Sequence, residues 1–197
     1  MVKLLKSLKK NLPFIWNAIE LFNGIIVYVL YGHTIKKAVT ETFASYTYST
    51  YQYRLLYQDD LQRLEQLFAT QPEGFDHYFK PHPFDIMTLK RLMMTPSFLM
   101  FGVFDEEKIV GYFFLRLFVN RTAFRGKMVD VMYQRQGIAK EMGRLMSEIV
   151  FRTSFRLYAT ICKTNYGSVA SSVAVNDIHI IKELPDNYIY IEYLKKC

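Results

Sequence analysis

The hydrophobic pattern divides the chain into one long apolar segment near its start and a succession of short elements after Thr50. Residues 14–31 are almost uninterruptedly apolar, which predicts a helix. Beyond Thr50, apolar runs alternate with turn residues, and their periodicity predicts strands and helices. In order, the predicted elements are a strand at 51–57, helices at 59–69 and 84–94, strands at 98–105 and 108–119, a strand at 126–133, a helix from Gly137, a strand at 155–163, a helix at 168–175 and two final strands within 178–194.

Short polar motifs support several of these elements. Asp59 and Gln62 have the spacing of a capping box at the start of one helix, and Asp85 is placed to cap the next. The acidic turn 105–108 joins two apolar runs, which predicts a β-hairpin, and residues 185–187 form a second turn between strands. The order of the elements predicts an α/β (α+β) domain with a mixed central sheet and flanking helices.

The positive charge of the chain is concentrated at its beginning. The net charge is +7, and residues 1–40 contribute +5 of it, since six lysines stand there against Glu20 alone. The remainder is nearly balanced and carries no zinc-finger, helix-turn-helix or RNA-binding motif, so we expect no nucleic-acid partner. We therefore divide the chain into a basic, apolar helical extension, residues 1–45, and one domain, residues 46–197. The lysines are Lys3, Lys6, Lys9, Lys10, Lys36 and Lys37.

The apolar run of the extension does not have the pattern of a signal peptide or of a typical membrane span. It lacks the small residues of a cleavage site, and it barely reaches the ~18 residues of a span. Asn17, Glu20 and Asn23 recur at every third position, on or near one face of a helix. This amphipathic pattern predicts a peripheral helix on the membrane surface, with residues 3–31 in contact with anionic lipid. Packing on the domain, or on a second subunit of a homodimer, is equally consistent with it.

The cysteines indicate the compartment. Cys162 lies in an apolar run and Cys197 ends the sequence. Two such cysteines predict no disulfide framework, and so a cytoplasmic protein, at the inner face of the membrane if the first helix binds lipid.

The junction between the strand at 126–133 and the following helix has an unusual sequence. It reads "YQRQGIAKEMG" and places no Ser, Thr, Asp or Asn at the helix entry. The first N–H groups of a helix need acceptors, which such side chains usually supply. Without them, an anion can bind the free N–H groups, favoured by the helix dipole, and Gly137 leaves room for its approach.

Within this junction, Gln134, Gly137 and Ala139 resemble the signature Gln/Arg-x-x-Gly-x-Gly/Ala of the GNAT superfamily of acetyl-CoA-dependent N-acetyltransferases. The resemblance extends from about Tyr51 to Tyr193. It implies a GNAT-like, mostly antiparallel sheet, acetyl-CoA or another acyl-CoA as cofactor, and no metal. The cofactor-binding positions that it implies are Lys127, Met128, Val129, Gln134, Arg135, Gln136, Gly137, Ile138, Ala139, Asn165 and Ser168.

The sequence departs from the family at the catalytic positions. Ala123 stands where many members carry a glutamate base, and Ser172 stands where many carry a tyrosine acid. Ser172 remains a candidate donor to the departing thiolate. His82, in a proline-rich loop, is the candidate base, because an imidazole pKa near ~6.5 suits proton removal at neutral pH. His77 and Asp130 are weaker candidates, and Cys162 is interpreted as a core residue.

The acceptor predicted by this pattern is a small-molecule amine. A cleft lined by Phe79, His82, Phe84 and Tyr112 would suit a sugar ring, and a membrane-bound first helix would favour an amino sugar of envelope polysaccharide. Two other functions fit the sequence. The missing glutamate and tyrosine are consistent with a non-catalytic acyl-CoA-binding module, and the first forty residues with a membrane-tethered scaffold.

Overall fold

The structure is a computed structural model that describes residues 13–46 and 50–196, with side chains from residue 18 onward. The elements are the helix α2 (Pro13–Ala44), β1 (Gln52–Leu55), the 3-10 turn η1 (Gln58–Asp60), α3 (Leu61–Ala69), η2 (Phe75–His77), α4 (Ile86–Met93), β2 (Phe98–Asp105), β3 (Lys108–Leu117), β4 (Thr122–Val129), η3 (Val131–Tyr133), α5 (Ile138–Arg152), β5 (Arg156–Cys162), α6 (Tyr166–Val173), β6 (Asn176–Glu183) and β7 (Tyr188–Lys195).

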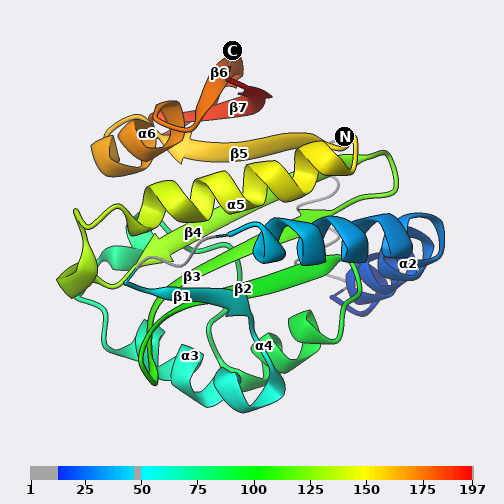
Figure 1. Cartoon of the computed structure of the whole chain (residues 1–197), viewed down its shortest axis with the longest axis horizontal. Helices are drawn as coiled ribbons and strands as arrows, with labels where there is room; N and C mark the ends of the chain where they lie inside the picture. The colour runs from blue at the N-terminus through cyan, green and yellow to red at the C-terminus, as the bar shows by residue number, and fades with distance from the viewer. Residues whose placement is uncertain (1–12, 47–49, 197) are drawn as a thin grey trace.

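The strands form one seven-stranded sheet in the order β1-β2-β3-β4-β5-β7-β6. Every neighbouring pair is antiparallel except β4 and β5, which are joined through α5 and run parallel. α5 covers one face of the sheet, and α3 and α4 cover the other (Figure 1). The prediction of a mixed, mostly antiparallel sheet between helices is confirmed.

Two apolar cores lie on the two faces of the sheet. On one face, Met142, Leu145 and Ile149 of α5 pack on the strands together with Val27 and Ile35 of α2. On the other face, apolar residues of α3 and α4 pack on alternate residues of β2 and β3. The period-2 alternation of the strands therefore supplies both cores, which explains why β3 is buried along almost its whole length.

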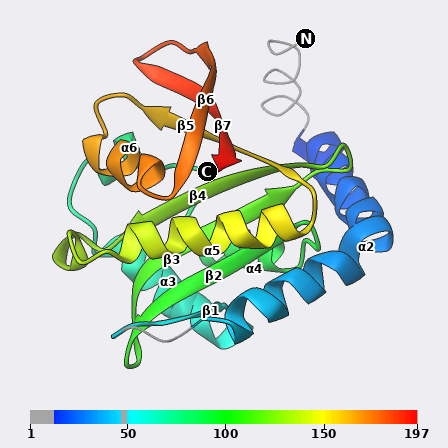
Figure 2. The ribbon, with the colours of Figure 1, turned by 45° about the horizontal axis from the view of Figure 1, so that its top comes forward.

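The strands β4 and β5 separate after a short stretch of pairing. Only Thr122, Ala123 and Phe124 pair with β5, opposite Arg156, Leu157 and Tyr158. Beyond Phe124, β4 remains paired with β3 and β5 with β7, so the sheet opens between β4 and β5 toward α6 (Figure 2). The second half of β4 consequently presents an edge of backbone groups that β5 does not use. We call this gap the β4–β5 opening.

Two local predictions are wrong, one about the bounds of a strand and one about a helix cap. The strand predicted at 126–133 is β4 at Thr122–Val129, because Asp130 accepts a hydrogen bond from the Met132 N–H and so starts a 3-10 turn. The capping box predicted from Asp59 does not form. Residues 58–60 form a 3-10 turn instead, and α3 begins after Asp60 without a side-chain cap. The cap predicted at Asp85 is confirmed, since its carboxylate accepts from the Thr88 N–H at 2.9 Å.

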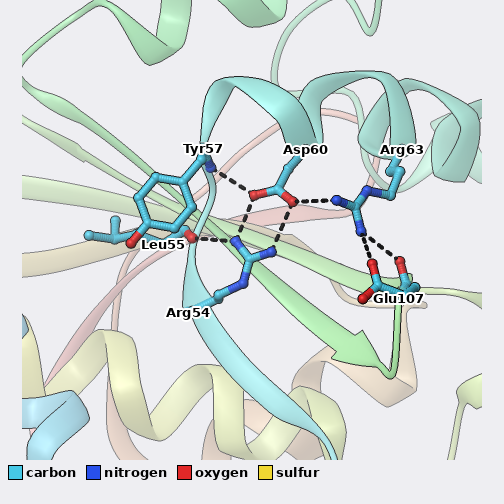
Figure 3. Close-up of polar contacts among 6 residues, drawn as sticks. All are labelled: Arg54, Leu55, Tyr57, Asp60, Arg63 and Glu107. Carbon is cyan, nitrogen blue, oxygen red and sulfur yellow. Dashed lines mark hydrogen bonds and ion pairs between the residues drawn. The ribbon is translucent and has the colours of Figure 1, made fainter.

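Asp60 has a different function from a helix cap. Its carboxylate is 2% exposed and accepts two hydrogen bonds from Arg54, at 2.6 and 2.9 Å, and one from the Tyr57 N–H (Figure 3). Arg63 approaches the same carboxylate and also binds Glu107 of the β2–β3 turn. This network joins β1 to α3 and to the hairpin.

The helix α2 attaches to the domain through polar side chains. Asn23 donates to the Leu117 carbonyl at 3.0 Å and accepts from the Val119 N–H at 3.1 Å, and Glu20 pairs with Arg116 at 2.6 Å. The polar face predicted from the sequence therefore turns toward the domain; the side chain of Asn17 and the lysines at 3–10 lie outside the described residues. The outward side chains are large and apolar: Ile19, Leu21, Phe22, Ile25, Tyr28, Val29 and Leu30 are 49–73% exposed.

Candidate active site

The backbone between β4 and α5 adopts two left-handed conformations. Arg135 has φ 64° and Gly137 has φ 82°, and the N-cap of α5 is Gly137, which offers no side chain to the helix. A non-glycine residue at positive φ costs free energy and persists where the surroundings require it. A side chain added at Gly137 would meet no heavy atom within 4 Å, so the conformation, and not crowding, is the structural reason for glycine there.

This turn leaves a row of backbone donors free. The Gly137 carbonyl accepts from the N–H groups of Lys140 and Glu141, but no hydrogen bond in the described part of the chain uses the N–H groups of residues 134–139. Residues 134–137 are exposed, and the side chain of Gln136 accepts a hydrogen bond from Tyr51. Six consecutive residues, Gln134 to Ala139, thus offer free N–H groups at the positive end of a helix, an arrangement that binds phosphate groups.

The predicted pantetheine positions lie on the free edge of β4. Lys127, Met128 and Val129 follow the last residue that pairs with β5, so their backbone borders the β4–β5 opening. The Met128 side chain packs in the core under α3 and α4. The Lys127 side chain points to the opposite face and donates to the Ala139 carbonyl at 2.7 Å and to Ser171 Oγ at 2.9 Å.

The two cofactor-binding residues predicted at the start of α6 contact each other. Asn165 is the N-cap of α6, and its side-chain oxygen accepts from the Ser168 N–H at 3.0 Å. This is the ordinary capping role of an asparagine at a helix start. Both residues stand at the far side of the opening from β4, and their contact with a cofactor stays a prediction.

An aromatic cleft of about 490 Å³ lies on the face of the sheet opposite α5. Gly126 of β4 and Thr160 of β5 line its inner end, so the cleft reaches the β4–β5 opening. Of the four residues predicted to line this cleft, only Phe79 does so. Tyr112 is fully buried, Phe84 stacks on Phe68, and His82 is not part of the lining. The aromatic lining consists of Tyr78, Phe79, Phe98, Phe114, Phe118, Phe124 and Tyr188.

His82 lies behind the wall of this cleft. Its Nδ1 is 2.8 Å from the Pro83 carbonyl, so Nδ1 carries a proton, and Nε2 accepts from the Tyr112 hydroxyl at 3.1 Å. Burial lowers the pKa of His82, so the ring is neutral at pH 7. To act as the base, His82 Nε2 would have to give up its hydrogen bond with the Tyr112 hydroxyl and take a proton from the substrate amine. Its catalytic role stays a prediction.

Ser172 is completely buried in the described structure, and its hydroxyl lies 3.1 Å from the Tyr193 hydroxyl of β7. Its role as the donor to the departing thiolate stays a prediction. Tyr193 was not predicted as a site residue, and neither was its neighbour Arg125, whose guanidinium stacks on the Tyr193 ring at 3.4 Å. The only sequence signal for Arg125 was a charged residue two positions before Lys127 within a strand.

The fold can be compared with known proteins. No family model matches the sequence, and a search of curated proteins finds no match. Many solved structures do match. Ribosomal-protein-S5-alanine acetyltransferase from Vibrio fischeri is 19% identical, with TM-score 0.63 over 77% of this chain and 96% of that one. The GNAT domain of S. lividans PAT is 12% identical, with TM-score 0.61 over 73% and 90%.

A third structure contains the cofactor. PaiA N-acetyltransferase from Thermoplasma acidophilum, in complex with coenzyme A, is 13% identical, with TM-score 0.59 over 74% of this chain and 99% of that one. In all three, the match covers nine tenths or more of the other chain, so the likeness concerns the complete domain and not one motif. The fold of this chain is therefore that of the GNAT acetyltransferases.

Proposed function

We propose that this chain is an acyl-CoA-dependent N-acyltransferase that transfers an acyl group directly to a small-molecule amine. One observation carries the proposal: the free N–H groups of residues 134–139 follow the unpaired half of β4, and the aromatic cleft is lined by Gly126 and Thr160 on the two strands that border the β4–β5 opening. The likeness to GNAT acetyltransferases supports it.

The described residues fit coenzyme A. The N–H groups of residues 134–139 would hold its pyrophosphate, and the backbone of Lys127, Met128 and Val129 would hold its pantetheine arm. Acyl-CoA supplies the thioester that the amine attacks. The protein orients the amine in the cleft, and a nearby base takes its proton. Proximity of this kind accounts for much of the rate enhancement in direct transfer.

Direct transfer also needs a base for the amine and a donor for the departing thiolate. His82 is proposed as the base and Ser172, through its contact with Tyr193, as the donor to the departing thiolate. His82→Gln preserves hydrogen bonding but removes the basic nitrogen, and it should lower kcat at least tenfold while leaving KM for acyl-CoA unchanged. An unchanged kcat across pH 6 to 9 would exclude His82 as the base.

The acceptor is proposed to be an amine carried on a ring, such as an amino sugar of envelope polysaccharide. Aromatic rings stack on the apolar faces of sugars, and seven of them line the cleft. Release of CoA thiol should be followed with amino sugars, polyamines and lysine peptides, each corrected for hydrolysis. Preference for amino sugars supports this acceptor, and preference for peptides excludes it. If the chain binds acyl-CoA but transfers no acyl group to any amine, it is a non-catalytic acyl-CoA-binding module. If it binds no acyl-CoA at all, the membrane-tethered scaffold is the function that remains.

We also propose that α2 lies on an anionic membrane surface at the inner face of the cytoplasmic membrane. Ala18–Ala44 has the length and composition of a membrane span, with hydropathy 1.4. Asn23 and Glu20, however, bind the domain, while the exposed apolar residues between Ile19 and Leu30 face outward, and the lysine-rich residues 3–10 precede them in the sequence. A helix fixed along one side can lie on lipid but not cross it.

Vesicle co-sedimentation tests the membrane contact. The full chain should bind vesicles with phosphatidylglycerol more tightly than neutral vesicles, and Phe22→Ser with Val29→Ser should abolish binding without changing CoA affinity. A dimer in light scattering, with no vesicle binding, would instead assign the apolar face to a second copy of the chain.

A further inference from the structure

Arg125 is a buried arginine that no carboxylate neutralises in the described part of the chain. Its side chain is 6% exposed, and it belongs to none of the ion pairs found among the residues whose side chains are described. Burial lowers its pKa, but the ordinary pKa of arginine is so high that the guanidinium remains charged. Burying an uncompensated charge is costly, which calls for a functional reason.

The guanidinium is held so that one of its edges remains unused. Nη1 has three acceptors within hydrogen-bond distance for its two N–H groups: the Gly143 carbonyl at 3.1 Å, Ser147 Oγ at 2.8 Å and Asn176 Oδ1 at 3.2 Å. The Tyr193 ring stacks against its face and fixes its plane. Nε and Nη2 have no hydrogen-bond partner. These two nitrogens form the edge that binds a carboxylate through two parallel hydrogen bonds.

Lys127 is a second buried basic group on the same face of β4. Its ammonium is held by the Ala139 carbonyl and by Ser171, and it belongs to none of the ion pairs found in the described part of the chain. Burial, with repulsion from Arg125 as a further cause, lowers the pKa of Lys127 well below the ordinary value. The charged form of Lys127 is therefore costly in the free protein, and an anionic ligand beside it would favour that form.

The two basic side chains lie along the path from the cofactor loop into the β4–β5 opening. Lys127 contacts the first turn of α5 through Ala139, and Arg125 contacts Gly143, one turn further in. Arg125 is also among the residues that line the aromatic cleft, while its guanidinium lies on the α5 face of the sheet. The phosphates of coenzyme A would be held outside, by the free N–H groups of residues 134–139. The only part of an acyl-CoA that could bring a negative charge this far in is the acyl group.

We propose that the acyl group transferred by this enzyme ends in a carboxylate, as in malonyl-CoA or succinyl-CoA, and that the Nε–Nη2 edge of Arg125 binds this carboxylate. The inference rests on the proposed function and specifies its donor. The amine nitrogen forms a bond to the thioester carbonyl carbon, and the C–S bond breaks. The base takes one proton from the amine, the thiolate leaves and takes up a proton, and the product is an amide that keeps its free carboxylate.

Calorimetric titration of the wild-type chain tests the donor class directly. The ligands are coenzyme A, acetyl-CoA, butyryl-CoA and succinyl-CoA, of which the last two carry acyl groups of four carbons and differ in the terminal carboxylate. Succinyl-CoA should bind at least tenfold more tightly than butyryl-CoA, because a desolvated bidentate pair with arginine is among the strongest hydrogen-bonded contacts. This ratio of the two affinities is measured on the wild-type chain alone, so it does not depend on whether a variant folds.

Three variants locate the effect. Arg125→Met keeps the volume of the side chain and should reduce the ratio to about one, mainly by weakening succinyl-CoA. Arg125→Lys keeps the charge but not the paired donors, and should retain only part of the ratio. Arg144→Met removes the same charge from the exposed face of α5 and should leave the ratio unchanged.

The possible failures are distinguishable. If the wild type binds all four ligands with equal affinity, the dicarboxylic donor is excluded while the proposed function stands. If Arg125→Met weakens acetyl-CoA as much as succinyl-CoA, Arg125 supports the cofactor in general and the inference is overturned. If the folded wild type binds no coenzyme A at all, the proposed function and the inference fail together.

Discussion

Arg54 and Arg125 are two arginines on strands of one sheet, and their surroundings differ in one respect. Arg54 donates two hydrogen bonds to the buried carboxylate of Asp60, so its charge is neutralised within the protein (Figure 3). Arg125 is more deeply buried, yet its acceptors are a carbonyl, a hydroxyl and an amide. The first arrangement stabilises the connection between β1 and α3. The second leaves a charge that only a ligand can neutralise.

The comparison predicts opposite effects of mutation on stability. Asp60→Ala leaves Arg54 without its partner and removes the acceptor of the Tyr57 N–H, so it should lower the free energy of unfolding by about 3 kcal/mol. Urea denaturation at pH 7 measures this. A loss below about 1 kcal/mol would show that Asp60 contributes no more than a surface pair.

The pH dependence of stability sharpens the same point. Burial raises the pKa of Asp60, but the hydrogen bonds from Arg54 and the Tyr57 N–H outweigh it, and the pKa lies below its ordinary value. The contribution of Asp60 is therefore complete above about pH 4 and is lost as the pH falls through the depressed pKa. The difference in unfolding free energy between wild type and Asp60→Ala should stay constant from pH 7 to 5 and shrink below about pH 4. A difference that grows with acidity would contradict this assignment.

Arg125→Met should leave stability unchanged or raise it by about 1 kcal/mol, because no acceptor is orphaned. The single proton of the Ser147 hydroxyl can still go to Asn176 Oδ1 at 2.8 Å, and the Gly143 carbonyl lies inside α5, where the helix supplies a backbone donor. Thermal and urea unfolding of the free protein measure the change. A loss comparable to that of Asp60→Ala would mean that Arg125 is a structural residue like Arg54.

Asn23→Ala should have a smaller effect, a loss of about 1 kcal/mol, because Asn23 is neutral and partly exposed. It removes the bonds to Leu117 and Val119 that hold α2 to the domain. Hydrogen exchange should then show faster exchange in α2 and not in α5. Equal change in both helices would mean that α2 is held by its apolar contacts alone.

The sequence predicted most of the fold because the elements follow local signals. The turn 105–108 and the cap Asp85 specify a hairpin and a helix by themselves. Local signals failed at the start of α3, where the sequence offers two adjacent acidic residues. Only the three-dimensional position of Arg54 determines that Asp60, and not Asp59, is the buried carboxylate. They also failed to place β4 correctly, because the turn at Asp130 depends on one side-chain contact.

For the site, the sequence predicted the loop but not its surroundings. The absence of a capping residue at Gly137 was visible, and the structure leaves the same N–H groups free. The positions of His82 and Arg125 relative to the cleft depend on packing between distant strands and loops, which periodicity does not encode. Charge within an apolar strand was the available signal for Arg125.

Calorimetric binding of coenzyme A to the wild type and to Gly137→Glu tests the central claim most directly. The glutamate places a negative charge at the free N–H groups of α5. Gly74→Glu is the matched control, because Gly74 has the same φ of 82° and the same open surroundings outside the cofactor loop. We expect wild type and Gly74→Glu to bind coenzyme A with similar affinity, and Gly137→Glu, still folded, to bind it at least ~100-fold more weakly. Equal binding by both variants, or none by the wild type, would contradict it.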